Sequence, residues 1–144
     1  MMHIKTATKE NIAEIYKIEQ ICFSAPWSES SIEESLDNPA SHFLIAYEDD
    51  EVAGYMGLQI FSGEGYVTNI AVLPQFRGMG IAKALIGEQM KNDMEFITLE
   101  VRESNLPAIN LYIKMGFDNA GVRLKFYSNP TENAVIMTKI FDKE

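Results

Sequence analysis

The middle of the chain reads as a strand, a glycine-bearing loop and a helix in immediate succession. Residues 66–72 (YVTNIAV) are rich in β-branched and aromatic side chains, which favour a strand. The loop at 75–80 (QFRGMG) follows, and residues 81–86 (IAKALI) begin a helical pattern. Such a loop directs backbone N–H groups outward at the positive end of the helix. Because Gly78 and Gly80 lack a Cβ atom, a phosphate can approach the backbone closely, and the segment predicts an anion site.

Two familiar phosphate-binding loops do not match this segment. The P-loop requires Gly-Lys-Ser/Thr, and no such triplet follows Gly80. The dinucleotide fingerprint requires a third glycine and an acidic residue about 20 residues further on, a spacing that Ala82 and Leu85 do not supply. The pattern that fits is Gln/Arg-x-x-Gly-x-Gly/Ala, which starts at Gln75 and in which Arg77 can add a charge-assisted contact. The alternative to an anion site is an ordinary strand-to-helix turn, in which the glycines only relieve backbone strain.

The loop resembles that of the GNAT acetyltransferase superfamily, where it holds the pyrophosphate of acetyl-coenzyme A. Residues 98–117 (TLEVRESNLPAINLYIKMGF) resemble a second hallmark, a strand "LEVR" followed by "SN..AI.LY...GF". Residues 25–29 (APWSE) and 69–72 (NIAV) are similar to one subfamily, the ribosomal-protein-alanine N-acetyltransferases. Those enzymes acetylate the N-terminal alanine of a small-subunit ribosomal protein. The resemblance covers residues 4 to about 140.

Periodicity and turn residues predict a single α/β domain over residues 1–144. Helices are expected at 8–25, 28–38, 79–91 and 106–115, and strands at 43–47, 52–61, 66–72, 96–101, 117–127 and 133–140. This ααβββαβαββ order implies a mixed sheet with helices on both faces, which is the superfamily fold. The resemblance further implies that strands 66–72 and 96–101 splay apart at one end, and that the pantetheine arm of the cofactor lies in the opening.

Acetyl transfer to an amine requires loss of a proton from the amine, stabilisation of an oxyanion and a proton donor for the leaving thiolate. Glu100 is the candidate general base, because it lies mid-strand, projects opposite to Leu99 and Val101, and matches the glutamate of "LEVR". Tyr112 is the candidate general acid: a phenol is protonated at neutral pH, and this one matches the tyrosine of "AI.LY". It lies two helical turns after Asn105, so both can face one groove. A solvated glutamate and a packed helix tyrosine are the structural alternatives.

The remaining site residues follow from the resemblance. The backbone of 70–72 is expected to bind pantetheine and polarise the thioester carbonyl, and Asn105 to contact the cofactor as well as cap its helix. The predicted cofactor-binding residues are Ile70, Ala71, Val72, Gln75, Arg77, Gly78, Met79, Gly80, Ile81, Ala82, Asn105 and Tyr112. The candidate walls of a peptide groove are Trp27, Tyr66, Phe126 and Tyr127. Two further carboxylates, Glu64 and Glu103, are expected to be solvated.

Two positions depart from the subfamily pattern. Phe126-Tyr127 stands where a Tyr-Tyr pair is common, and Asn133 stands where an acidic residue is common. Each change removes a possible contact to a cationic N-terminus. A lysine side chain, a polyamine or another small amine therefore remains an alternative acceptor. An acetyl-CoA-binding regulatory module without transferase activity is the alternative from another class.

Composition limits the partners. The net charge of −9 disfavours nucleic-acid binding and suits a cationic partner such as a basic protein N-terminus. No apolar run approaches the roughly 20 residues of a membrane span, and no secretory signal is visible. Cys22 is the single cysteine and is expected to be a buried core thiol, while His3 and His42 lie too far apart to indicate a metal site. We therefore expect a cytoplasmic acetyltransferase that uses acetyl-CoA and no metal.

Overall fold

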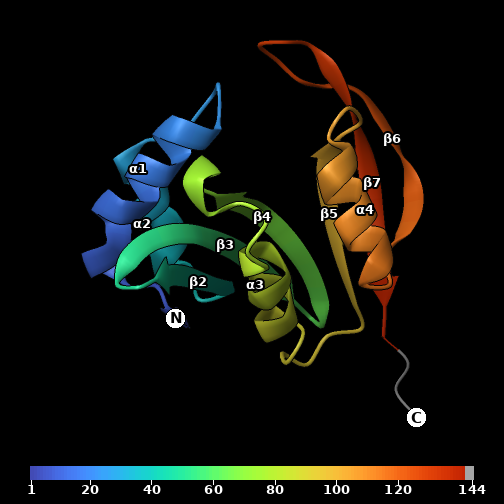
Figure 1. Cartoon of the computed structure of the whole chain (residues 1–144). Helices are drawn as coiled ribbons and strands as arrows, with labels where there is room; N and C mark the ends of the chain where they lie inside the picture. Colours follow the sequence, from blue (N-terminus) through green and yellow to red (C-terminus); the bar gives the residue numbers. More distant parts are fainter. Residues whose placement is uncertain (142–144) are drawn as a thin grey trace.

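A mixed sheet of seven strands forms the centre of the computed structural model, which describes residues 1–141 (Figure 1). The strand order is β1-β2-β3-β4-β5-β7-β6, and every neighbouring pair is antiparallel except β4 with β5. The strands are β1 (Met2–Thr6), β2 (Ser41–Glu48), β3 (Glu51–Phe61), β4 (Glu64–Val72), β5 (Phe96–Arg102), β6 (Asp118–Tyr127) and β7 (Glu132–Ile140). The helices are α1 (Ile12–Cys22), α2 (Glu29–Asp37), α3 (Ile81–Gln89) and α4 (Leu106–Lys114), with short 3-10 turns η1 (Lys9–Asn11) and η2 (Pro74–Phe76).

The predicted order ααβββαβαββ requires one correction, because β1 precedes the first helix. This strand has only five residues and pairs with β2 at the edge of the sheet. Met2 and Ile4 are half-buried, whereas His3 and Lys5 are exposed. The alternation that marks a strand is therefore present, but it is too short to distinguish a strand from a polar N-terminal segment. The other ten elements occur in the predicted order.

The β4–β5 pair opens after three parallel pairings, which run from Glu64↔Phe96 to Tyr66↔Thr98. On its other side, β4 contains an irregularity against β3: Gly57 pairs with Asn69 and Leu58 pairs with Val67, so Thr68 lies between them without a partner. A bulge of this kind bends and twists a strand. From residue 67 onward, β4 diverges from β5, as Figure 1 shows. The predicted splay of the central strands is confirmed.

Helices cover both faces of the sheet. Successive residues of β3 point to opposite faces: Tyr55 packs in a cluster with α1 and α2, and Met56 in a cluster with α3 and Tyr112 of α4. The cluster with α3 and Tyr112 includes Leu99 and Val101 of β5, and the cluster with α1 and α2 includes Ala71 of β4, so each splayed strand is packed against a hydrophobic cluster. Within residues 1–141, no helix is long and apolar enough to cross a membrane.

Candidate active site

A cavity of about 790 Å³ lies at the splayed end of β4 and β5. Its walls come from these two strands, from the loop between α1 and α2, from α4 and from the turn between β6 and β7. It brings together the following residues predicted from the sequence: Trp27, Ile70, Glu100, Asn105, Tyr112, Phe126 and Tyr127. A carboxylate, a phenol and an open strand edge therefore share one space.

Tyr66 does not line this cavity. It lies where β4 and β5 still pair, at Tyr66↔Thr98, and its ring packs edge-on against Phe96 at 5.9 Å between centroids. Its hydroxyl donates a hydrogen bond of 2.6 Å to Glu64. The alternative carboxylates also lie outside the cavity lining, since Glu64 holds Tyr66 and Glu103 accepts a hydrogen bond from Asn133 at 3.4 Å.

Glu100 occupies the middle of β5, between the buried side chains of Leu99 and Val101. Its carboxylate is 30% exposed and forms an ion pair with Arg123 of β6, with 3.3 Å between Oε1 and Nε. Sequence reasoning missed Arg123, because nothing in the chain indicates that a residue 23 positions downstream reaches Glu100. That contact depends on how β6 and β5 each pair with β7.

Tyr112 points from α4 into the cavity and is only 5% exposed. Its ring packs against Phe117 at 5.7 Å. Burial raises the pKa of Tyr112 to about 12, and the nearby Tyr127 contributes to this. Burial also raises the pKa of Tyr127 to about 12, with the charge of Glu100 as the next cause. Both phenols are therefore protonated throughout the neutral range. Tyr127 lies near enough to Glu100 and Tyr112 to interact electrostatically with both.

Arg102 fixes the turn between β6 and β7 at the rim of the cavity. Its guanidinium donates to the carbonyl oxygens of Ser128 and Pro130, both at 3.0 Å, and to Glu132 Oε1 at 3.1 Å. It also lies 4.5 Å from the centre of the Tyr127 ring, a cation–π distance. Hydrogen bonding from Ser104 and from Arg102 lowers the pKa of Glu132. The sequence motif named Arg102 without indicating these partners.

Glu19 is a buried carboxylate on α1. It is 1% exposed and accepts hydrogen bonds from the hydroxyl of Tyr55 at 2.5 Å, from Asn69 Nδ2 at 2.9 Å and from the backbone N–H of Trp27 at 2.9 Å. These partners compensate the loss of water that burial imposes on a charge. Glu19 thereby links β4 to the loop that contains Trp27. The available signal was the spacing of Glu19, which shares one helix face with Ile12, Ile15 and Cys22.

The glycine loop ends in a left-handed backbone conformation that favours glycine. Gly78 and Gly80 have φ of +82° and +81°, and open space surrounds the position of a Cβ at each. Gly80 is the residue that precedes α3, and no side chain caps this helix. The first N–H groups of α3 thus have no side-chain acceptor, which leaves them available to a ligand. Gln75, Met79, Ile81 and Ala82 complete the predicted loop, although none of them lines the cavity.

Backbone groups of β4 also face the opening. Leu73 N–H donates to Ala53 of β3 at 2.7 Å, and the groups of adjacent residues in a strand point to opposite edges. The backbone of Ala71 therefore faces β3, while that of Ile70 and Val72 faces the free edge. The carbonyl of Val72 accepts a hydrogen bond of 2.9 Å from Arg77 Nε, so Arg77 folds back toward β4.

Cys22 lies beside the same strand end and lines the cavity, half-buried rather than in the core as expected. Its Sγ atom is 3.6 Å from the carbonyl oxygen of Val72 and 3.9 Å from Arg77. Burial raises the pKa of Cys22. The protonated thiol predominates at neutral pH, which does not suit a nucleophile.

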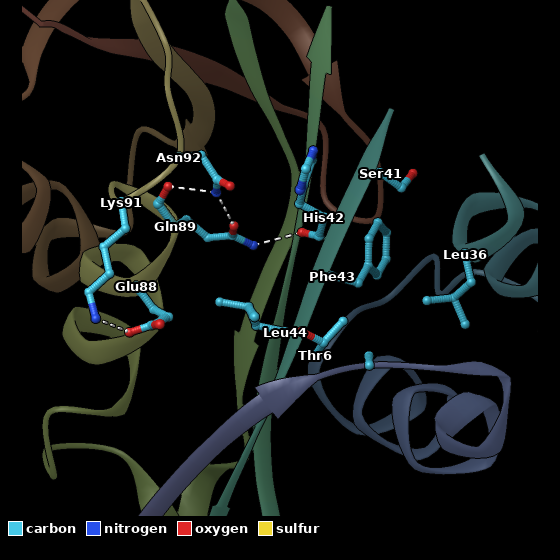
Figure 2. A pocket seen from close by; sticks show the side chains of 11 residues that line it. Thr6, Leu36, Ser41, His42, Phe43, Leu44, Glu88, Gln89, Lys91 and Asn92 are labelled. Carbon is cyan, nitrogen blue, oxygen red and sulfur yellow. Dashed lines mark hydrogen bonds and ion pairs between the residues drawn. The ribbon is translucent and has the colours of Figure 1, made fainter. Parts of the chain in front are cut away.

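A second cavity, of about 420 Å³, lies between β2 and the C-terminal end of α3 (Figure 2). Its buried Gln89 donates to the carbonyl of His42 at 2.7 Å and accepts from Asn92 at 3.0 Å. These polar groups therefore pair with one another, and none of the predicted site residues lies there. Among residues 1–141, no cluster of three or more metal-ligating side chains occurs.

Comparison with known proteins is consistent with this geometry. The model of the acetyltransferase (GNAT) family matches residues 12–117. A ribosomal protein bS18-alanine N-acetyltransferase of Haemophilus ducreyi is 33% identical over 143 residues, covering 93% of this chain and 97% of that protein. An N-alpha-acetyltransferase of Sulfurisphaera tokodaii is 34% identical over 151 residues, with coverage of 93% and 90%. The crystal structure of the ribosomal-protein-S18-alanine N-acetyltransferase from Escherichia coli superimposes with a TM-score of 0.92 at 27% identity, covering 100% of this chain and 96% of that one.

Proposed function

This chain belongs to the acetyltransferase (GNAT) family, and from that membership we propose that it acetylates the N-terminal alanine of the small-subunit ribosomal protein bS18. Acetyl-CoA is the proposed donor. The observation that carries the proposal is the junction of Glu100, Tyr112 and the free edge of β4 in one cavity. The names of relatives that match over nearly their whole length supply the acceptor.

The residues present fit acetyl-CoA. The loop ending at Gly80 and the uncapped start of α3 would hold the pyrophosphate, since backbone N–H groups and open space are both available there. The free edge at Ile70 and Val72 would hold the pantetheine arm through backbone hydrogen bonds, and Asn105 lies at the opposite wall. When bound, acetyl-CoA supplies an activated acetyl thioester.

Two side chains carry the proposed proton transfers. Glu100 accepts a proton from the acceptor's ammonium group, directly or through water, and so frees the nitrogen lone pair for attack on the thioester carbonyl. The ordinary pKa of an α-amine is about 7.7–8.0, so this step is easier than for a lysine at about 10.4. Tyr112, protonated at neutral pH, then donates its proton to the leaving thiolate.

The acceptor groove is proposed to run between Trp27 and the Phe126–Tyr127 pair, whose rings meet edge-on at 5.0 Å. The net charge of −9 favours approach of a basic N-terminus. Asn133, one of the two departures from the subfamily pattern, does not line the cavity; it bonds to the backbone of Lys125 at 2.9 Å. The missing carboxylate at this position therefore removes no group from the cavity lining. A ribosomal acceptor also makes the cytoplasm the proposed compartment.

The proposal is tested by incubating the protein with acetyl-CoA and a peptide that begins with free alanine followed by basic residues. Mass spectrometry of fragments locates the acetyl group. Transfer to the α-amine, with none to an internal lysine, supports the proposal. A control peptide of the same sequence with a blocked α-amine should remain unmodified. Preferential acetylation of that control, or of spermidine in a competition assay, would redirect the assignment to a side-chain or small amine.

A further inference from the structure

The carboxylate of Glu100 already has a cationic partner. Arg123 Nε lies 3.3 Å from Glu100 Oε1, and the two side chains are 56% and 30% exposed. Arg123 sits opposite Ala134 in the β6–β7 ladder, and Ala134 sits opposite Arg102 in the β7–β5 ladder. The guanidinium therefore reaches diagonally across the sheet to the middle of β5. Arg123 does not itself line the cavity, so its guanidinium reaches the Glu100 carboxylate from outside the cavity lining.

The other charged and titratable groups around Glu100 do not perform this role among the described residues. Arg102 lies two positions along β5, on the same side, but it is held by Glu132 and by two carbonyl oxygens of the turn. Tyr127 faces Glu100 as a neutral phenol at neutral pH. Lys125, the other cation near the end of β6, donates its backbone N–H to Asn133 and forms no ion pair with Glu100. Arg123 is thus the cation that pairs with the proposed base.

We propose that Arg123 is a positioning residue that pairs with Glu100 in the free enzyme and competes with the acceptor's ammonium group for that carboxylate. This inference rests on the proposed role of Glu100. Two cations that approach one carboxylate repel each other, so an arriving ammonium group weakens the Arg123 contact. A partly exposed ion pair contributes little to stability and is easily exchanged. Arg123 orients the carboxylate in the free enzyme, and acceptor affinity is lower because of the competition.

The experiment measures acceptor binding in the presence of coenzyme A, where no transfer can occur. Trp27 is the single tryptophan and lines the cavity, so its fluorescence reports binding of an Ala-initiated peptide that lacks tryptophan. We compare the full chain with Arg123→Gln, which removes the charge but keeps a long side chain. Lys125→Gln is the matched control, because it removes the same charge from the same strand without touching Glu100.

The expected result is that Arg123→Gln binds the peptide about threefold to fivefold more tightly, the range that a partly exposed ion pair allows. The KM for the peptide should fall by a similar factor, while the KM for acetyl-CoA stays unchanged. Lys125→Gln should alter peptide affinity less than about twofold. Weaker or unchanged peptide binding by Arg123→Gln would overturn the inference, as would an equal gain in Lys125→Gln.

A double-mutant cycle separates competition at Glu100 from a general effect of charge. In a Glu100→Gln background, where no ion pair exists, Arg123→Gln should leave peptide affinity unchanged. A gain as large as in the wild-type background would contradict competition at Glu100. The two hypotheses fail separately. Absence of α-amine acetylation by the wild-type protein refutes the proposed function, whereas normal acetylation with no coupling between Arg123 and Glu100 refutes only this inference.

Discussion

At the scale of single residues, the proposed proton transfers depend on Glu100 and Tyr112. Glu100→Gln and Tyr112→Phe preserve shape but remove the proton acceptor and the proton donor. We expect each to lower turnover by at least about tenfold, in keeping with the usual size of acid–base effects, while the Kd for coenzyme A changes little. The measurement is kcat with an Ala-initiated peptide. Tyr66→Phe is the matched control, because it removes a phenol outside the cavity. Full activity in the first two variants would contradict the assigned roles.

Motifs indicated the residues proposed to transfer protons, but not the residues that pack against or pair with them. Glu100 and Tyr112 were named from their place in a pattern, and both line the cavity. Arg123 and Glu19 were missed, because their contacts join segments far apart in the chain. An ion pair across three strands depends on the pairing register, which a local sequence pattern does not contain. Tyr66, predicted as a wall of the peptide groove, lies instead where β4 and β5 still pair, away from the open end.

At the scale of elements, the glycine loop and α3 offer a matched pair of substitutions. Gly80→Ala places a Cβ on a residue with φ of +81°, which costs about 1 kcal/mol, and obstructs the approach of a phosphate. We expect it to weaken coenzyme A binding at least tenfold, or about 1.4 kcal/mol. Gly87→Ala makes the same change inside α3, where open space surrounds the position. It should stabilise the protein by up to about 1 kcal/mol and leave binding unaltered.

Calorimetric titration with coenzyme A and urea unfolding measure these two effects. Equal binding by the Gly80→Ala and Gly87→Ala variants would exclude the loop as the pyrophosphate site.

The strand–loop–helix order was readable from local residues, because glycine and a helical pattern are both local signals. The bulge at Thr68 was not readable from the sequence, because a bulge is defined by how two strands pair, here β3 and β4. The splay came from the family resemblance, and β1 was too short to detect.

At the scale of the whole molecule, the splayed sheet unites two cores and places buried phenols beside the site. Tyr55 packs with α1 and α2 and donates to Glu19, while Tyr112 packs with Phe117 in the cluster that includes α3. Burial raises the pKa of both groups, and the charge of Glu19 also raises that of Tyr55. The arrangement that forms the cavity therefore also makes the fold sensitive to high pH.

The direction of this sensitivity follows from the raised pKa of Tyr112, about 12 in the folded state against an ordinary value of about 10. The folded state holds the proton more tightly, so the stabilisation is complete below pH 10 and is lost as pH rises toward 12. For Tyr112 alone the loss is about 3 kcal/mol. We expect the free energy of unfolding in urea to fall steeply between pH 9 and pH 12, and less steeply in Tyr112→Phe. Parallel pH profiles for the two proteins would show that Tyr112 ionises freely in the folded state and that the cavity wall around it admits water, which would also weaken its case as a proton donor.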